Sequence, residues 1–292
     1  EMIFLLKILM LNRIKKKKMI NYSKYVFLLI SLFLLSCAED EPEWSAADIC
    51  PETGMNAYGI PNRGTFVDER DGREYKYTTI GKQVWMAENL KYELPNPYST
   101  CYGKEFCVPR GFALNDTVQI CKTDTTRLAK IAERLHSTCE TNECIVDEFC
   151  EKYGRFYTLI KDAKDRGFLD RDIVDSVCPK GWHVPTKVEW ETLAESVEGV
   201  VNRLLKEEAI LAMDSIAIEY QKKDGGPIDA CGFSALYAGY YDYSGGLSSV
   251  FRATYFTTST MLNTGAAYSV IFGESISIQS IGTKISIRCI KD

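Results

Sequence analysis

The chain has little of what builds a metal centre or a membrane span. Its 292 residues include only two histidines, and no two of its eleven cysteines are separated by two residues. This scarcity argues against the common tetrahedral zinc sites, which use such spacings and several histidines. The longest predominantly apolar stretch, residues 25–35, is too short for a membrane-spanning helix, which needs about 20 residues. No metal and no other cofactor is predicted.

The apolar stretch 25–35 has the length of the hydrophobic region of a signal peptide. It ends in "LLSC", with a leucine three residues before Cys37 and a small serine directly before it. This pattern is typical of a bacterial lipoprotein cleavage site, so Cys37 is predicted to be the lipidated first residue of the mature protein. A plain signal peptide and a short anchor helix are the alternatives. Residues 1–36 are interpreted as a signal peptide, with upstream sequence before a start at Met19.

Positive charge is scarce in the predicted mature protein. Positions 1–36 hold seven of the 35 basic and one of the 40 acidic residues, which leaves 28 basic against 39 acidic residues, a net charge of −11. Such a surface repels nucleic acid, so no nucleic-acid partner is expected. Residues 37–62 begin "CAEDEPEW" and are predicted to be an acidic tether. Export and the lipid anchor predict an outer-membrane location, and the acidic run favours display at the cell surface.

Ten cysteines remain once Cys37 is set aside, an even number. An exported chain meets an oxidising compartment, so disulfides are the expected state of these thiols. Four of the ten crowd into residues 103–149, where apolar residues also recur near helical spacing. We interpret residues 103–149 as a cysteine-rich, partly helical insertion stapled largely to itself.

Both ends of the remaining sequence favour short β-strands. Residues 63–92 carry two alternating runs around Asp71-Gly72, a pair that suits the positive φ angles of a tight hairpin turn. A second turn at Gly81-Lys82 leads into "QVWMAENL". Towards the other end, strand-like runs alternate with turns: "FSALYAG", "ATYFTTST", "AAYSVIFG" and "KISIRCI". Strands, then helices, then strands predict an α+β domain over residues 63–292 whose two ends meet in one sheet.

Two helices are predicted between these ends. One covers "YGRFYTLIKDAKD", residues 153–165. The other begins after Thr186, because a threonine followed three residues later by Glu189 forms a capping box. Trp190 and the apolar residues that follow at helical spacing would give this second helix its buried face.

Five sequence blocks occur in an order that resembles a known family. They read "DGREYKYTTIGKQVWMAENLKY", "CEKYGRFYT", "CPKGWHVPTKVEWETL", "GFSALYAGYYDYSGG" and "SIRCIKD". Together they resemble the Fibrobacter succinogenes major paralogous domain over residues 64–292, apart from the insertion. The resemblance implies a C-type-lectin-like α+β fold with two main helices and adjoining terminal strands, similar to the fold of formylglycine-generating enzymes. No common activity defines the family, so the resemblance implies a fold rather than a function.

The resemblance also implies two disulfides. Cys178 would join Cys289 and tie the start of the second helix to the last strand. Cys101 would join Cys150 across the insertion. The four insertion cysteines would then pair among themselves.

Two residues could carry chemistry, and each also has a structural interpretation. The two possible partners of His183 already have other roles, because Cys178 is expected in a disulfide and Glu189 in the capping box. His183 is therefore expected to be a structural residue that bonds a backbone group. Cys231 pairs with Cys50 by elimination, or is the free thiol that formylglycine-generating chemistry requires. The motifs with which lectins of this fold bind calcium are missing from the sequence. No catalytic residue and no metal ligand is assigned.

Tyrosines are the remaining candidates for binding. The run "LYAGYYDYSGG" contains Tyr240, Tyr241 and Tyr243, whose rings could stack on sugars or on a protein surface. Alternation along a strand would bury about half of them. The sequence thus predicts a non-enzymatic, lipid-anchored binding or adhesion module for an extracellular polysaccharide or a surface protein. The alternatives are an enzyme of the formylglycine-generating type and a structural envelope protein without a small ligand.

Overall fold

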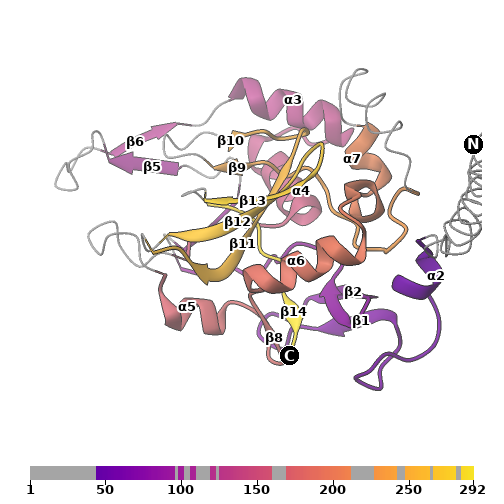
Figure 1. The fold of residues 1–292 in the computed structure, drawn as a ribbon. Helices are drawn as coiled ribbons and strands as arrows, with labels where there is room; N and C mark the ends of the chain where they lie inside the picture. The colour runs from indigo at the N-terminus through magenta and orange to yellow at the C-terminus, as the bar shows by residue number, and fades with distance from the viewer. Residues whose placement is uncertain are drawn as a thin grey trace, which may run out of the picture. The chain divides into compact units, whose positions relative to one another are not determined.

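The antiparallel hairpin predicted around Asp71-Gly72 opens the main sheet of the computed structural model (Figure 1). Strand β1 (Arg63–Val67) pairs with β2 (Glu74–Ile80), and Gly72 in the turn has a φ of 75°. Gly81, with a φ of 58°, turns the chain into β3 (Gln83–Met86), as predicted. The structure describes residues 44–95, 98–101, 106–109, 119–122, 125–159, 169–211, 227–241, 247–263, 266–280 and 284–292. The predicted lipidation residue Cys37 and the candidate Tyr243 lie outside these ranges.

The two ends of the domain meet in this sheet, as the sequence predicted. Strand β14 (Ile290–Lys291) lies between β3 and β8 (Trp182–His183), so the strand order is β1-β2-β3-β14-β8. Ile290 stands opposite both Trp85 and His183. All pairings in this sheet are antiparallel, which agrees with the α+β class.

A second antiparallel sheet contains β11 (Thr254–Met261), β12 (Ala267–Phe272) and β13 (Ile276–Ser280). The segment 284–286 links it to the rest of the domain through single bridges to Tyr157, Tyr241 and Phe256. Two short pairs complete this region: β9 (Tyr240–Tyr241) with β10 (Leu247–Ser248), and β4 (Ser99–Thr100) with β7 (Phe156–Tyr157). The run "FSALYAG" does not form the predicted strand, because only Ala235 and Gly239 in it make isolated bridges.

The prediction of a helix over residues 153–165 is wrong for the part that the structure describes, residues 153–159. Residues up to Tyr153 belong to α4 (Asn142–Tyr153), which ends at Gly154 with a φ of 79°. Residues Phe156–Tyr157 then form β7 instead of continuing a helix. The other helices are α2 (Ala46–Ile49), α3 (Thr125–Leu135), α5 (Arg171–Ser176), α6 (Lys187–Ser196), the 3-10 helix η2 (Val201–Leu204) and α7 (Glu207–Leu211). Among the described residues, none of the helices is long and apolar enough to cross a membrane.

Helix α6 has the predicted capping box. The Thr186 hydroxyl accepts from the Glu189 backbone N–H at 3.2 Å, and Glu189 Oε2 accepts from the Thr186 N–H at 2.7 Å. Trp190 on the inner face of α6 is fully buried and stacks on Phe256 of β11, with ring centroids 5.1 Å apart. The same aromatic cluster includes Trp85, Phe233 and Phe272. Burial of five such rings is a large share of the hydrophobic stabilisation of the fold.

The predicted tether 37–62 is packed over its described part. Residues 45–62 belong to the same compact unit as the rest of the domain. Cys50 is buried and bonded to Cys231, and the buried Asn62 side chain donates to the Thr53 carbonyl at 2.6 Å. The disulfide of Cys50 ties this part of the predicted tether to the core, so the prediction of a solvated tether is wrong for residues 45–62.

Four disulfides lie within the described residues. Cys178–Cys289 and Cys101–Cys150 are the two that the resemblance implied, and Cys50–Cys231 is the pair left by elimination. Cys139–Cys144 lies inside the predicted insertion. In the same insertion β5 (Phe106–Pro109) pairs with β6 (Gln119–Lys122), with Cys107 opposite Cys121. Helix α4 runs across the predicted insertion boundary at residue 149, so the insertion is continuous with the core.

Candidate functional site

The structure describes Tyr240 and Tyr241 of the predicted binding tyrosines and buries one of them. Tyr241 is only 2 % exposed, its ring packs edge-on against Phe156, and its hydroxyl donates to the Cys101 carbonyl at 3.3 Å. Tyr240 is partly buried and packs against Tyr255, with ring centroids 4.5 Å apart. Of the three predicted ligand-binding tyrosines, the structure thus assigns Tyr241 to the core. The alternation of a strand could have placed either Tyr240 or Tyr241 inside, and the contact with Phe156 decides it.

His183 has two carboxylate partners instead of the predicted backbone group. Its Nδ1 lies 2.7 Å from Asp292 Oδ1, and its Nε2 lies 2.9 Å from Glu189 Oε1. The hydrogen bond to Glu189, followed by that to Asp292, outweighs burial and raises the pKa of His183. Burial would raise the pKa of Glu189, but the bonds from His183 and Thr186 hold it below its usual value. Glu189 therefore caps α6 with one oxygen and binds the histidine with the other, which is a structural role.

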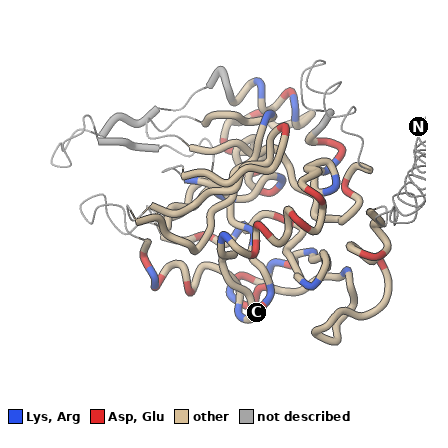
Figure 2. Tube along the Cα trace, in the orientation of Figure 1, with Lys and Arg blue, Asp and Glu red and all other residues tan. Residues whose placement is uncertain are grey.

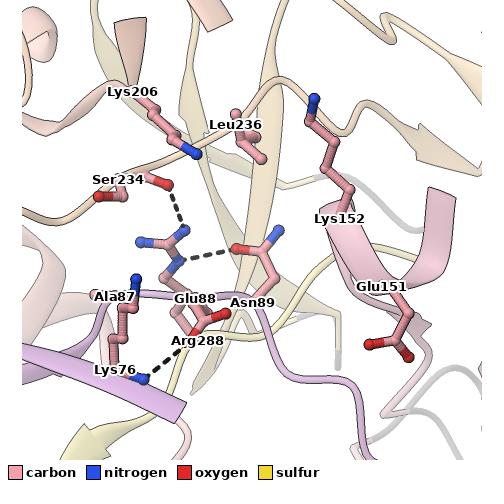
Figure 3. A pocket seen from close by; sticks show the side chains of 10 residues that line it. All are labelled: Lys76, Ala87, Glu88, Asn89, Glu151, Lys152, Lys206, Ser234, Leu236 and Arg288. Atoms are coloured by element: carbon pink, nitrogen blue, oxygen red, sulfur yellow. Dashed lines mark hydrogen bonds between the residues drawn. The ribbon is translucent and has the colours of Figure 1, made fainter. Parts of the chain in front are cut away.

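A pocket of about 260 Å³ opens elsewhere, among segments that are distant in the sequence (Figure 3). Its walls come from β2, the residues directly after β3, α4, the residue before α7, the loop before β9 and the segment before β14. Six of its ten lining residues are charged. The full set is Lys76, Ala87, Glu88, Asn89, Glu151, Lys152, Lys206, Ser234, Leu236 and Arg288.

Arg288 is the buried cation of this pocket, with 1 % exposure. Its Nε donates to Asn89 Oδ1 at 2.8 Å, its Nη2 donates to the Ser234 carbonyl at 3.1 Å, and its Nη1 donates to the Phe233 carbonyl. The guanidinium also lies over the Phe233 ring, 4.3 Å from the centroid. Burial lowers the pKa of Arg288 to about 9. Within the described residues no carboxylate forms an ion pair with it, although the charges of Asp229 and Glu88 act on it from further away and oppose the fall in its pKa.

The loop that faces Arg288 is held by a partly buried carboxylate. Asp229 accepts from the Ser234 N–H at 2.8 Å and from the Ser234 hydroxyl at 2.6 Å. Ser234 has a φ of 55°, a left-handed conformation that turns its carbonyl towards Arg288. Burial raises the pKa of Asp229, against these hydrogen bonds and the nearby charge of Arg288.

The two sides of the pocket share one acidic residue. Lys152 of α4 and Lys206 before α7 both pair with Glu208, at 3.1 Å and 3.2 Å. Glu151 turns away to Arg73, at 2.8 Å, and Glu88 accepts from the Lys76 backbone N–H at 2.9 Å. No ion pair joins the Lys76 side chain to any of the described residues. The pocket therefore has four basic and two acidic liners, in a chain whose net charge is −5.

The other chemical candidates are accounted for by disulfides. Cys231, the thiol on which formylglycine-type chemistry would depend, is bonded to Cys50. Cys139, Cys144 and Glu148 lie close enough together to share a metal ion, but both thiols are joined in a disulfide. A thiol in a disulfide is neither a nucleophile nor a thiolate ligand.

Comparison with protein families identifies the domain. The Fibrobacter succinogenes major domain (Fib_succ_major) matches residues 78–291, well over half of the chain. The chain belongs to this family. Comparisons with curated proteins and with solved structures find no match. The matched range of this Fibrobacter succinogenes major domain includes every pocket residue except Lys76.

The sequence did not reveal the pocket of this Fibrobacter succinogenes major domain. Asn89 and Arg288 are 199 positions apart, and neither belongs to a short motif with known chemistry. The one available signal is a charged residue inside the apolar run "KISIRCI". A buried arginine in such a run needs several acceptors, which must come from other segments of the chain.

Proposed function

We propose that this protein is a non-catalytic recognition module that binds extracellular polysaccharide in the pocket around Arg288. The observation that carries the proposal is the pocket itself: a cavity of about 260 Å³, lined mainly by charged and polar side chains and braced by a buried arginine. Sugars offer many hydroxyl groups, which are bound by carboxylates, amides and ammonium groups held in fixed positions. Glu88 and the lysines supply such groups.

The setting of the protein is part of the same proposal. A signal peptide and a lipid on Cys37 would hold the domain at the outer membrane, displayed towards the exterior. The disulfides support an oxidising location, because disulfides persist outside the reducing cytosol. The rigid, disulfide-braced domain would then present its pocket to extracellular polymers.

We also propose that the α+β fold is C-type-lectin-like. Three features support this: the N- and C-terminal strands share one sheet, a second small antiparallel sheet follows in the last third of the chain, and a disulfide joins Cys178 to Cys289. The disulfide state of Cys231 favours the binding module over an enzyme of the formylglycine-generating type, which would need a free thiol.

The test is retention of residues 38–292 on a panel of insoluble plant and microbial polysaccharides. Lys152 is partly exposed on α4 at the pocket edge, so Lys152→Trp would place an indole over the opening. Lys130→Trp is the matched control, because Lys130 is exposed on α3 and does not line the pocket. The proposal expects retention on at least one polysaccharide, lost in Lys152→Trp and kept in Lys130→Trp. Failure to bind any polysaccharide in the panel would refute it and leave a protein partner.

A further inference from the structure

We infer that the ligand is an acidic sugar. The pocket binds the carboxylate of a uronic acid unit through Lys206 and Lys152, and Arg288 lies at its floor. This inference rests on the proposed polysaccharide-binding function and specifies its ligand class. It depends on three observations, namely the local charge, the arrangement of the lysines around Glu208, and the size of the pocket.

The charge of the pocket is opposite to that of the protein. The chain has five more acidic than basic residues, whereas basic residues outnumber acidic ones by four to two among the pocket liners. Figure 2 shows charged residues of both signs along most of the described chain, while strands β11, β12 and β13 carry none. A basic site in an acidic protein attracts an anion locally while the remaining surface repels polyanions, which favours selective over non-specific binding.

The lysines already hold a carboxylate. Glu208 accepts from Lys152 Nζ at 3.1 Å and from Lys206 Nζ at 3.2 Å, so one carboxylate lies between the two ammonium groups. Both bonds, that from Lys152 first, keep the pKa of Glu208 below its usual value. Glu208 itself does not line the pocket, whereas both lysines do. Each ammonium has three donors, so a carboxylate that enters the pocket can bond to the same lysines in addition to, or in place of, Glu208.

Arg288 makes the pocket floor electropositive. Its guanidinium is buried and hydrogen-bonded only to neutral acceptors. The charges of Asp229 and Glu88 act on it, but neither forms a direct ion pair with it within the described residues, so part of its field remains in the pocket. Figure 3 shows Lys206 on the same side of the pocket as Arg288, with Lys152 and Glu151 on α4 opposite. A carboxylate between these groups would interact with three positive charges in a partly desolvated site, where such interactions are stronger than in water.

The pocket size favours one sugar unit over a longer stretch of chain. A volume of about 260 Å³ lies below the usual range for drug-sized ligands, which begins at about 300 Å³. A single hexuronate fits such a space, while its neighbours in the polymer extend beyond the opening. Its hydroxyl groups could donate to Glu88, whose side chain is partly exposed beside the pocket.

The experiment is calorimetric titration of residues 38–292 with trigalacturonate and, in parallel, with its methyl ester, which keeps the sugars and removes the charges. Lys206→Glu should lower the affinity for trigalacturonate by roughly tenfold or more, because an attraction becomes a repulsion. Glu208→Gln should raise it by about threefold, because the lysines lose their internal competitor. Lys82→Glu, at an exposed turn residue outside the pocket, is the charge-matched control and should leave the affinity within about twofold.

The two proposals fail in different ways. If the ester binds as well as the acid, or if Lys206→Glu and Glu208→Gln shift affinity no more than Lys82→Glu does, the uronate inference is wrong while polysaccharide binding can still hold. If trigalacturonate does not bind but neutral polysaccharides in the panel do, the same conclusion follows. If nothing in the panel binds, the proposed function itself is wrong. Circular dichroism of each variant separates these results from loss of folding.

Discussion

Arg288 Nε lies 2.8 Å from Asn89 Oδ1, and this hydrogen bond joins the segment before the last strand to the segment after β3. The amide nitrogen of Asn89 in turn donates to the Tyr153 carbonyl at 2.8 Å, at the end of α4. One buried side chain therefore connects three parts of the fold around the pocket. Because Asn89 is only 5 % exposed, the groups that lose their bonds to its side chain are left largely buried.

Asn89→Ala should destabilise the domain by about 2–4 kcal/mol, because the buried Arg288 Nε and the Tyr153 carbonyl both lose a partner. Urea unfolding followed by tryptophan fluorescence measures the loss. Asn142→Ala removes an exposed asparagine from the first turn of α4 and should change stability by less than about 0.5 kcal/mol. An equal loss of unfolding free energy in the two variants would show that the hydrogen bonds of Asn89 do not stabilise the domain.

Gly154→Ala should lower the stability of the fold more than an alanine substitution at a glycine that has a similar φ but open space around it. Gly154 has a φ of 79°, and a Cβ there would lie 2.6 Å from Asn89 Cβ and 3.0 Å from the Leu90 carbonyl oxygen. Gly59 has a φ of 70° and nothing within 4 Å of its would-be Cβ. Gly59→Ala should cost about 1–2 kcal/mol from the left-handed backbone alone. Thermal unfolding of both variants should show the larger loss for Gly154→Ala, and a smaller one would contradict the close approach to Asn89.

The contribution of His183 to stability should fall as the pH rises. Its pKa is raised in the folded state, so the stabilisation by Glu189 and Asp292 is complete below the unfolded pKa of about 6.5 and is lost as the pH rises through the higher folded pKa. The difference in Tm between the wild type and His183→Gln should therefore be larger at pH 6 than at pH 9. His136→Gln, at the exposed second histidine, should show no such trend. A difference that grows towards pH 9 would contradict a raised pKa.

Glu189 limits the same interaction at low pH. Its pKa is lowered in the folded state, so its contribution is present above its unfolded pKa and is lost as the pH falls through the folded value. Stabilisation by the pair is thus greatest between the unfolded pKa of Glu189, about 4.3, and that of His183, about 6.5. Tm measurements of Glu189→Gln from pH 3 to pH 6 should approach the wild type at the acidic end.

Removing the disulfide Cys50–Cys231 should release residues 45–62 from the domain. The bonded cysteines are 181 positions apart, and closing such a loop stabilises by up to about 5 kcal/mol in the chain-entropy model. The double variant Cys139→Ser, Cys144→Ser opens a loop of separation 5 and should cost about 2 kcal/mol at most. Unfolding curves and limited proteolysis between residues 45 and 62 would show the effect. The prediction fails if the double variant Cys50→Ser, Cys231→Ser loses no more stability than the Cys139, Cys144 variant and is not cleaved between residues 45 and 62.

Local features of the sequence predicted the fold better than they predicted the site. The hairpin around Asp71-Gly72 and the Thr186 capping box depend on a few neighbouring residues, and both formed, although residues 68–73 make a wider loop than the expected tight turn. The helix predicted after Tyr153 failed because Gly154 adopts a left-handed φ and ends α4 there. The described end of the tether was misjudged because the bond of Cys50 to a cysteine 181 positions away outweighs the local composition.

The candidate site could not be predicted because it is assembled from side chains that no local pattern connects. Tyr241 was a binding candidate by its chemistry, but its contacts with Phe156 and Cys101 place it in the core. Conversely, no pattern in the sequence connects Lys206 with Lys152, and only the fold brings them to one pocket. Long-range packing decides both outcomes, and it leaves no periodic signal in the sequence.

The position of β14 between β3 and β8 has a consequence for the order of folding. The main sheet is divided until residues 290–291 enter it, and the pocket has no floor until Arg288 reaches Asn89. Neither can be completed on a nascent chain while residues 284–291 are still inside the ribosome. Contacts between such distant positions also make folding slow, because the entropy cost of closing a long loop comes before the stabilising contacts form. The main sheet and the pocket therefore form together, at the last step of folding that these residues allow.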